Sequence, residues 1–522
     1  MKYVTVEEMR AVEKQADANG LSYAQMMENA GNGLGETVDL TCRHFLDKSV
    51  LGLVGSGNNG GDTLVALAYL AQQGWEATAY SVKSRPADDT LVHRLIDQGG
   101  KVIDGEADTQ YHQLRQVVKD NSVLLDGILG TGFRLPLKNT IADILDITTR
   151  VIKEKEQNTM IIAVDCPSGV DCETGEAAPQ AIKADITVTM AAIKAGLLKL
   201  PAFQLVGELR VVGIGLPDDL PVWKEIKRVV PDIEYVKSIV PERHLDAHKG
   251  TFGTALIVAG SQNYTGAALL AGKAAYFSGA GLVTLAIPTV LHTALSGQFP
   301  EATWLLLPDE AGVIADSAAN VLLEHKQKIT AILAGPGFGL IPTTKKFMEK
   351  WLKENNLRNN IIPTVVDADG LKLLAGIEGW PELLPENSIL TPHPGEMSVL
   401  TGLSVEQIQS NRLEIAEKYA QEWGHIVVLK GAFTVVSSPD GKSGVVPIAS
   451  PALARAGSGD VLAGIICGLR AQGVSSFDAA LAGAWIHGKA GLVAADAIGS
   501  TASVLAGDIL LGCANVMADI ED

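Results

Sequence analysis

Short apolar runs recur along this chain, and turns and helix-period segments separate them. This alternation predicts parallel β-sheets with helices on both faces, because each strand needs a crossover helix to reach the next. The expected fold class is therefore α/β, with ligands at the carboxyl ends of the strands. The predicted strands are Val50–Val54, Ala77–Val82, Ser122–Leu125, Met160–Val164, Thr254–Ala259, Leu282–Ile287, Ile329–Ala334, Ile361–Val366, Ser388–Leu390 and Ile426–Leu429, with helical patterns over 6–45 and 457–520.

The pattern breaks around residues 215–245, where four prolines and many charged residues occur together. A chain of 522 residues is longer than one hydrophobic core usually serves. We therefore expect a first domain over 1–220, a linker over 221–243 and a second domain over 244–522.

Composition restricts the partners. The formal net charge of −18 argues against nonspecific binding to nucleic acid or acidic membranes, where positive charge supplies the affinity. The five cysteines show no zinc-ligand spacing and are too few for a disulfide framework, so a cytoplasmic location is expected. The uncharged run 274–300 is interrupted by glycine and proline, which predicts a buried helix, strand and helix rather than a membrane span.

Three motifs of the first half follow predicted strands. The run 54–62, VGSGNNGGD, opens a helix, and its side-chain oxygens and amides suit a polar ligand or a hard cation. Asp126 and Asp165 begin the other two motifs, and Arg134 is able to pair with a phosphate. The alternative is that these are plain turns, with Asp62 as a helix cap. Cys166 is interpreted as a small buried residue rather than a nucleophile.

The second half contains Ala456-Gly457-Ser458-Gly459-Asp460 before an apolar helical run. Amides at a helix N-terminus attract an anion, and Asp460 beside them suits a base for a hydroxyl that attacks a phosphoryl group. A plain N-terminal cap remains the alternative. His393 between prolines and Lys430 at a strand end also have structural explanations, but they occur with the same motif.

GSGNNGGD, DGILGTG and VDCPSGVD together resemble the NAD(P)H-hydrate epimerase family over about residues 1–220. The resemblance implies a Rossmann-like three-layer fold and, as substrate, a reduced nicotinamide dinucleotide hydrated at C6 (NADHX or NADPHX). Asp165 is the implied acid–base residue, and Thr63 departs from the family, which often has glycine there. Implied substrate contacts are Asn58, Asn59, Gly60, Gly61, Asp62, Gly130, Thr131, Gly132, Phe133, Arg134, Leu135, Pro136 and Asp165, and implied potassium ligands are Asn59, Asp126 and Ser168.

From about His244 onward the chain resembles the ADP/ATP-dependent NAD(P)H-hydrate dehydratase family, which has a ribokinase-like fold. The motifs are HKG-FG, GS-YTGAA, AGPGFG, VDADGL, TPHPGE, LKGAFT and AGSGDVLAG, in the family's order. Arg455 departs from it by replacing a small residue. The resemblance implies that Ala255, Gly337, His393 and Asp460 contact the hydrated substrate, with Asp460 catalytic. The expected nucleotide site is Lys430, Gly431, Ala432, Phe433, Thr434, Gly457, Ser458 and Gly459.

The joined resemblance predicts a bifunctional repair enzyme. The first half would interconvert the R and S hydrates with bound K⁺, and the second would dehydrate the S form with ADP or ATP and Mg²⁺. We expect a homo-oligomer that binds neither nucleic acid nor membranes. Two alternatives stay open: a small-alcohol kinase in the second half, and a noncatalytic nucleotide-binding role for the first.

Overall fold

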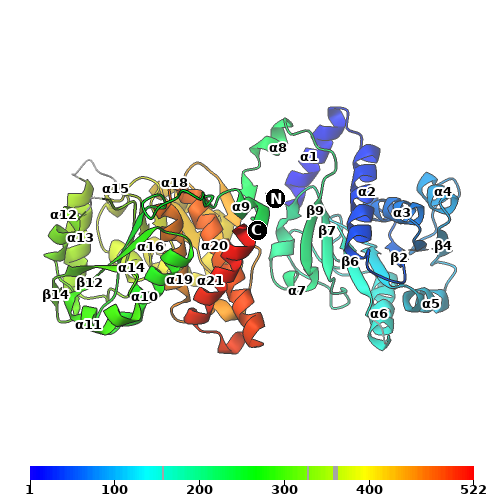
Figure 1. The fold of residues 1–522 in the computed structure, drawn as a ribbon. Coiled ribbons are helices and arrows are strands. Elements are labelled where there is room, and N and C mark those ends of the chain that lie inside the picture. The colour runs from blue at the N-terminus through cyan, green and yellow to red at the C-terminus, as the bar shows by residue number, and fades with distance from the viewer. Residues whose placement is uncertain (156–157, 326–327, 357–361, 522) are drawn as a thin grey trace. The chain divides into compact units, whose positions relative to one another are not determined.

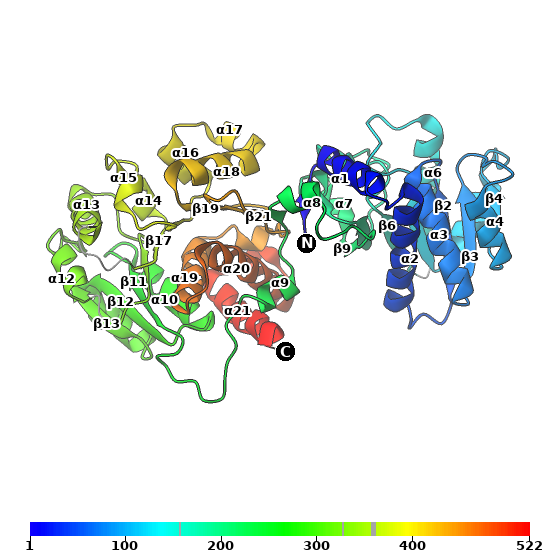
Figure 2. The same cartoon turned by 90° about the horizontal axis from the view of Figure 1, so that it is seen from above.

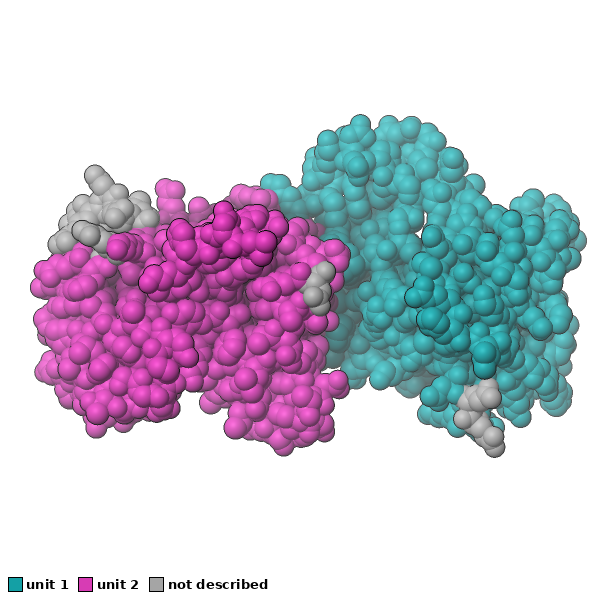
Figure 3. All heavy atoms as spheres, in the orientation of Figure 1, with its two compact units in different colours: residues 1–227 teal, residues 228–522 magenta. Residues whose placement is uncertain are grey.

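The computed structural model describes residues 1–155, 158–325, 328–356 and 362–521. The chain divides into two compact units, residues 1–227 and 228–522 (Figure 3). The division falls inside the segment 221–243, expected to be a linker. This segment is shared between the units: α8 (Pro221–Glu225) belongs to the first, and β10 (Arg228–Val229) and α9 (Ile233–Lys237) belong to the second.

Unit 1 is built on a seven-stranded parallel sheet with the order β4-β3-β2-β5-β6-β7-β9. The chain runs from β2 outward to β4 and then returns to β5 on the other side of β2, which creates a crevice at their carboxyl ends. The strands are β2 (Ser49–Val54), β3 (Glu76–Ser81), β4 (Lys101–Asp104), β5 (Val123–Gly127), β6 (Met160–Val164), β7 (Ile186–Met190) and β9 (Glu208–Val212).

Helices cover both faces of this sheet, as the alternation predicts (Figure 1). One core contains apolar side chains of α1 (Val6–Ala18), α2 (Tyr23–Thr41), α3 (Asn58–Gln72) and α4 (Thr90–Asp97). The other contains those of α5 (His112–Asp120) and α6 (Asn139–Glu154). The remaining elements are β1 (Tyr3–Val4), which pairs with β8 (Ile193–Lys194), η1 (Ala195–Leu198) and α7 (Phe203–Val206).

Unit 2 has a ten-stranded sheet, order β10-β21-β20-β19-β18-β17-β16-β11-β12-β13. It is parallel except where β20 pairs with β19 and β21. The predicted strand at 361–366 is observed as β17, and Ile361 lies outside the described residues. The strands are β11 (Thr254–Val258), β12 (Leu282–Pro288), β13 (Thr303–Leu307), β16 (Ala331–Ala334), β17 (Thr364–Val366), β18 (Ile389–Leu390), β19 (Ile426–Leu429), β20 (Val435–Ser437) and β21 (Ser443–Val445), with a hairpin of β14 (Asp309–Glu310) and β15 (Val313–Ile314).

Figure 2 shows two groups of helices on opposite faces of the sheet at β19. One consists of α16 (Pro394–Thr401), α17 (Val405–Ser410) and α18 (Arg412–Trp423), and the other of α19 (Ser458–Ala471), α20 (Ser476–Ile498) and α21 (Ala506–Glu521). The other helices are α10 (Thr265–Phe277), α11 (His292–Leu295), α12 (Ala318–Glu324), α13 (Pro342–Asn356), α14 (Asp369–Leu374) and α15 (Trp380–Leu383), with short 3₁₀ turns η2 (Thr289–Leu291), η3 (Ser296–Gln298), η4 (Pro451–Leu453) and η5 (Thr501–Ser503).

The α/β fold class is confirmed in both units. The uncharged run 274–300 forms the end of α10, then β12 and α11 after a short turn. Within the described ranges, none of the helices combines the length and the apolar character that crossing a bilayer requires.

Candidate active sites

A cavity of about 790 Å³ lies at the carboxyl edge of the unit 1 sheet. Its walls come from the loops after β2, β5, β6 and β7 and from the first two helices. The structure brings eight of the predicted substrate-binding residues to this cavity: Asn58, Asn59, Asp62, Gly130, Thr131, Gly132, Phe133 and Asp165. Gly60, Gly61, Arg134, Leu135 and Pro136 are not among the lining residues.

The glycines after β2 serve packing more than ligand approach. A Cβ at Gly60 would lie 2.0 Å from the Gly55 carbonyl oxygen, and one at Gly61 would lie 2.5 Å from the sulfur of Met27. A Cβ at Gly57 would meet nothing within 4 Å. Within this loop, Gly57 is therefore the position where a ligand is able to approach the backbone.

Asp165 is held by a network that the sequence did not predict. It follows β6 with a left-handed φ of 62°, and its Oδ1 accepts hydrogen bonds from Met190 N and Thr189 Oγ1, each at 3.0 Å. Lys194 forms an ion pair with the same oxygen and also donates to Met190 O at 2.8 Å. The Lys194 side chain is only 2% exposed, so its ammonium compensates the Asp165 charge away from bulk water.

Asp62 and Glu13 line the same cavity, but neither forms the ion pair with Lys194 that Asp165 forms. Burial raises the pKa of Asp62 well above its ordinary value, and the charge of Asp165 raises it further. Burial also raises the pKa of Glu13. Lys194 acts in the opposite direction on the pKa of Asp62, but it does not outweigh burial and the charge of Asp165. The cavity thus combines a carboxyl group paired with an ammonium and a carboxyl group whose pKa is raised, which are a candidate base and a candidate acid.

The three predicted potassium ligands lie around the Leu129 peptide. Leu129 N donates to Ser168 Oγ at 3.0 Å, and Asn59 Nδ2 donates to Leu129 O at 2.8 Å. Asp126 is 1% exposed, and its Oδ2 accepts from Ser168 N at 2.8 Å. Its Oδ1 is buried and has no hydrogen-bond donor among the described residues. A buried carboxylate oxygen in this position needs a cation or a proton.

Arg134 was expected to pair with a phosphate, and Cys166 was expected to be a small buried residue. The Arg134 side chain is 58% exposed and lies 3.5 Å from an Asp171 carboxylate oxygen, so its guanidinium is already directed to an acid. Cys166 is buried, and a hydrogen bond with Cys172 together with burial raises the pKa of its thiol. A protonated, buried thiol agrees with the interpretation of Cys166 as a packing residue.

Thr63, the departure from the epimerase family, is buried and is not among the residues that line the cavity. Its Oγ1 donates to Asn59 O at 2.7 Å. Its side chain fills the space beside two strand glycines, since a Cβ at Gly127 would lie 1.9 Å from Thr63 Oγ1 and one at Gly52 would lie 2.8 Å from Thr63 Cγ2. Thr63 therefore acts on the loop through packing of α3 against the sheet.

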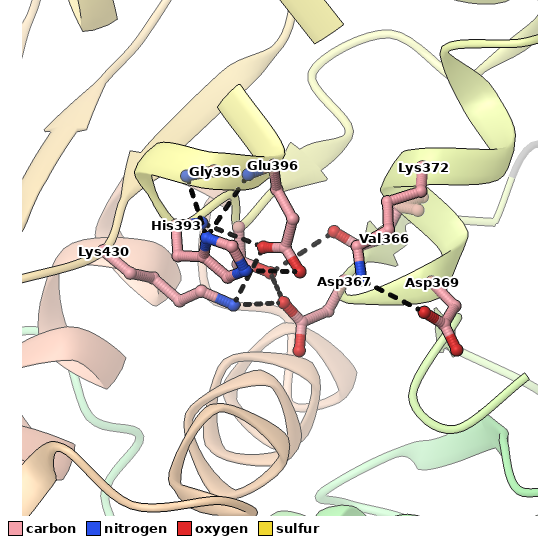
Figure 4. A network of polar contacts seen from close by, with 9 residues as sticks. Val366, Asp367, Asp369, Lys372, His393, Gly395, Glu396 and Lys430 are labelled. Carbon is pink, nitrogen blue, oxygen red and sulfur yellow. Dashed lines mark hydrogen bonds and ion pairs between the residues drawn. The ribbon is translucent and has the colours of Figure 1, made fainter. Parts of the chain in front are cut away.

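In unit 2, polar groups gather where β17, β18 and β19 end. Lys430 Nζ lies 2.6 Å from Asp367 Oδ1 and 3.6 Å from Glu396 Oε2, and Figure 4 shows it directed toward both carboxylates. Thr391 Oγ1 also donates to Asp367 Oδ1, at 2.6 Å. Burial alone would lower the pKa of Lys430, but Asp367 and Glu396 outweigh burial and raise it. The lysine is therefore a fixed cation at the sheet edge.

Asp460 lies in the first turn of α19, as predicted, and α19 begins beside this cluster. A Cβ at Gly459 would lie 3.5 Å from Lys430 Nζ. Burial raises the pKa of Asp460 to about 7, with a further contribution from the negative charge of Asp367. A carboxyl group that titrates near neutral pH is suited to general base catalysis.

His393 caps α16 with its side chain. Its Nδ1 accepts hydrogen bonds from the amides of Gly395 at 3.0 Å and Glu396 at 3.3 Å, so this nitrogen carries no proton. Its Nε2 lies 3.3 Å from Glu396 Oε1, and burial lowers the His393 pKa. A neutral ring with its proton on Nε2 satisfies all these contacts. Figure 4 places it beside Glu396 and Lys430.

The predicted anion-binding turn has one side chain directed inward. Ser458 is buried, and its hydroxyl lies 2.9 Å from Nε2 of His487, whose pKa burial lowers to about 4. Gly457 has a φ of 85°, a left-handed conformation that favours glycine. The turn therefore offers backbone groups, not the Ser458 hydroxyl, to an anion.

Ala255, implied by the resemblance to contact the substrate, lies in the interior of unit 2. Ala255 is the second residue of β11, is 0% exposed and packs in the hydrophobic core. It lies before the carboxyl end of the strand, and its contact with the substrate stays a prediction. Ala267 in α10 lies beside Gly337, since a Cβ at Gly337 would lie 3.0 Å from the Ala267 Cβ.

The predicted nucleotide loop 430–434 joins β19 to β20 and has a basic neighbour that the sequence did not reveal. A Cβ at Gly431 would lie 3.1 Å from Nη1 of Arg412, whose Nη2 donates to Leu429 O at 2.8 Å. Arg455, the departure from the dehydratase family, is exposed and donates to the Ala502 carbonyl.

Three residues of these sites, Asp367, Lys194 and Arg412, were not predicted from the sequence. Asp367 directly follows β17, as Asp165 follows β6, so the rule used for Asp165 applies to it as well. Lys194 had a weaker signal, a single lysine in the apolar run AAIKAGLL. Arg412 had none, because it lies on a helix far from any motif.

Family models match a part of each unit. A family model described as YjeF-related protein N-terminus matches residues 23–196, and one described as NAD(P)H-hydrate dehydratase matches residues 255–511. Among solved structures, the ADP/ATP-dependent NAD(P)H-hydrate dehydratase of Bacillus subtilis, co-crystallised with ATP/Mg²⁺, is 30% identical with a TM-score of 0.48, covering 56% of this chain and 99% of that one.

Two full-length relatives carry the same name. The bifunctional NAD(P)H-hydrate repair enzyme Nnr of Moorella thermoacetica is 36% identical over 537 residues, covering 100% of this chain and 98% of that protein. The enzyme of that name from Thermofilum pendens is 32% identical, covering 95% of this chain and 92% of that protein. The chain therefore belongs to the family of bifunctional NAD(P)H-hydrate repair enzymes.

Proposed function

We propose that this enzyme restores hydrated nicotinamide cofactors in two steps. Unit 1 interconverts the R and S hydrates of NADH or NADPH, and unit 2 dehydrates the S form with a nucleotide cosubstrate. The observation that carries the proposal is that the chain is similar over its full length to repair enzymes and has a different carboxyl site in each unit. In unit 1 the carboxyl group of Asp165 lies beside a buried lysine, and in unit 2 that of Asp460 titrates near neutral pH. A small-alcohol kinase fused to a binding module is not favoured, because the full-length relatives are repair enzymes.

Epimerisation at C6 needs a base and an acid in one cavity. Asp165 takes the proton of the C6 hydroxyl, the C6–O bond becomes a carbonyl and the C6–N1 bond breaks. Asp62 gives a proton to N1, and the reverse steps close the ring from the other face. The raised pKa of Asp62 and the Lys194 ion pair of Asp165 suit these opposite roles.

The cluster of Asn59, Asp126 and Ser168 fits a potassium ion. Asp126 Oδ1 is buried without a donor in the described chain, and Asn59 and Ser168 add neutral oxygens. One carboxylate with neutral oxygens suits a weakly demanding cation better than Mg²⁺, which requires tight octahedral geometry. K⁺ would supply a fixed positive charge near the substrate phosphates. We expect Asp126→Ala to abolish any potassium dependence of epimerisation and leave dehydration unchanged.

In unit 2, Asp460 takes the proton of the C6 hydroxyl of the S hydrate. The hydroxyl oxygen bonds to the terminal phosphoryl group, which leaves AMP when the magnesium complex of ADP is the cosubstrate. The C6–O bond then breaks, phosphate leaves with the electron pair, and loss of the C5 proton restores the double bond. In this proposal Lys430 and the amides near Gly459 stabilise the phosphoryl charge, and His393 and Gly337 contact the substrate; Lys430 Nζ would lie 3.5 Å from a Cβ at Gly459, which supports the first role.

The test is repair of a mixture of both hydrate epimers by the purified enzyme with ADP or ATP, following absorbance of the reduced nicotinamide. We expect both epimers to be consumed. Asp165→Asn should leave the R form to its spontaneous rate while the S form still reacts. If the enzyme releases a stable phosphoester instead of the reduced cofactor, the proposal is wrong.

A further inference from the structure

Unit 1 has a second cavity, which no assigned role uses. It has a volume of about 500 Å³ and lies at the same sheet edge as the first. Its walls include the loops that follow four neighbouring strands, with Ser56 after β2, Lys83 after β3, Glu106 after β4 and Leu129 after β5. Cavities of this size commonly hold small ligands.

The two cavities share a wall at the point where the strand order reverses. Ser56, Ile128 and Leu129 line both of them. The two loops of this wall are in tight contact, because a Cβ at Gly55 would lie only 1.9 Å from the Ile128 carbonyl oxygen. A ligand whose reactive ring lies by Asp165 in the first cavity is therefore able to pass over this wall and place its other half in the second.

Charge in the second cavity is available mainly from lysines. Glu106 already accepts a hydrogen bond from Ser84 N at 3.0 Å, and buried Asp108 accepts from Leu114 N at 2.9 Å and from a tyrosine hydroxyl. Lys83 and Lys138 are exposed, and neither forms a salt bridge in the part of the chain that the structure describes. The cavity therefore presents two ammonium groups without a salt bridge in the described chain, and Lys83 has Glu106 as a charged neighbour.

The residue after β3 indicates what these cations bind. In open α/β sheets that bind dinucleotides, an acid near the end of the second strand holds the ribose 2′-hydroxyl, whereas a basic residue accommodates a 2′-phosphate. Here β3 is followed by Val82, Lys83, Ser84 and Arg85. Arg85 is occupied by Asp89 at 2.6 Å and by the Gly55 carbonyl at 3.1 Å, so Lys83 is the cation at this position that forms no salt bridge within the described residues.

We infer that the second cavity binds the adenosine half of the hydrated dinucleotide and that Lys83 recognises the 2′-phosphate of the NADPH hydrate. The inference rests on the proposed epimerase function of unit 1. It assigns the cofactor preference of unit 1 to one side chain that lies outside the reactive cavity.

The test uses the full-length enzyme and measures epimerisation by chromatography of the R and S forms. Nucleotide is left out, so that only unit 1 contributes. Lys83→Ala should raise KM for NADPH hydrate about tenfold, the order expected for one charge-assisted contact. KM for NADH hydrate should change less than about twofold, and kcat should stay the same for both substrates, because the reacting groups are untouched. Lys119→Ala, an exposed lysine of α5 outside the cavity, is the matched control.

Two further measurements separate the possible failures. Adenosine 2′,5′-bisphosphate should inhibit wild-type epimerisation more strongly than AMP, and Lys83→Ala should remove this difference. Thr140→Trp, at an exposed position that lines the cavity, should raise KM for both hydrates. Equal losses for both substrates in Lys83→Ala, or no effect of Thr140→Trp, overturn the inference while epimerisation by the wild type still stands. A wild type that does not epimerise overturns the proposed function itself.

Discussion

Asp165 and Asp460 are the two proposed bases, and their neighbours give them different properties. Asp165 shares one oxygen with a buried ammonium and two further donors. Asp460 lies among Asp367, Asp369 and Glu396, with Lys430 as the opposing charge. The first is a carboxylate that its surroundings hold in place, and the second is a carboxyl group that gains and loses its proton near neutral pH.

Dehydration should therefore depend on pH through Asp460. The base must be unprotonated and its pKa is about 7, so kcat should rise as pH increases from about 6 to 8. Asp460→Asn should lower kcat by about 10²–10⁴, the usual contribution of a general base, with nucleotide binding retained. A loss of less than about tenfold, measured at saturating ADP and S hydrate, would contradict the role of base.

The same carboxyl group costs stability at high pH. Its pKa is raised from 3.8 to about 7 in the folded protein, so the folded state holds the proton more tightly than the unfolded state does. Its contribution to stability is present at low pH and is lost as pH rises through about 7. In thermal melting at pH 8, the Tm of Asp460→Asn should be higher than that of the wild type. The difference in Tm should be smaller at pH 5.

Lys194 should matter for the ionisation of Asp165. Lys194→Met leaves a buried carboxylate without its cation, which disfavours the ionised form and often costs several kcal/mol. We expect the pH profile of epimerisation to move to higher pH and its rate at neutral pH to fall at least about tenfold. Circular dichroism melting is the control for the folding of unit 1, and Lys183→Met, at an exposed position, is the matched variant. An unchanged pH profile would exclude the proposed positioning role.

At the scale of elements, small residues bring α10 and α19 together. A Cβ at Gly464 would lie 2.2 Å from the Ala271 carbonyl oxygen, and one at Gly468 would lie 2.6 Å from the Ala275 carbonyl oxygen. Close packing fixes α19, and with it the position of Asp460 at the sheet edge. The glycine content of this helix, unfavourable for an isolated helix, is explained by its neighbour.

Gly464→Ala should therefore destabilise unit 2 despite the better helix propensity of alanine. Overpacking against backbone costs about 1–3 kcal/mol, against about 1 kcal/mol gained in propensity. Gly507→Ala in α21 is the matched control, because a Cβ there meets nothing within 4 Å. Urea denaturation should show a loss for Gly464→Ala and no loss for Gly507→Ala. Equal behaviour of the two variants would show that α10 adjusts freely.

At the scale of the whole molecule, each unit has its own sheet and its own core. The end of unit 1 is tied to its beginning: Lys2 Nζ donates to Ile226 O at 2.9 Å, and Val222 N donates to Gln15 Oε1 at 3.0 Å. These bonds lie beyond residue 220, the boundary expected from the sequence.

A fragment of residues 1–227 should consequently fold alone and epimerise the hydrates without nucleotide. A fragment of residues 1–220 lacks α8 and should melt at a lower temperature, because the Lys2 and Gln15 contacts are lost. Circular dichroism melting and the epimer assay compare the two. A longer fragment that is no more stable than the shorter one would show that α8 does not contribute to the fold of unit 1.

The sequence alone determined the fold class and the edge of each sheet that carries the chemistry. Central parallel strands are buried on both faces, so β2, β5, β6 and β19 appear as apolar runs that local patterns reveal. The residues at and after the carboxyl ends of such strands lie at one edge by topology, which is why the sequence predicts that Asp126 near the end of β5, Asp165 after β6 and Lys430 after β19 lie at these edges.

Only the tertiary structure decided the features that depend on distant neighbours. The edge strands β4 and β9 are partly exposed and lack a continuous apolar run, so their pairing partners define them. Lys194 forms an ion pair with Asp165, which lies 29 positions away in the sequence. Ala255 is buried in the core because of its position within β11. The ionisation of Asp62 and Asp460 follows from burial and surrounding charge, which exist only once the chain has folded.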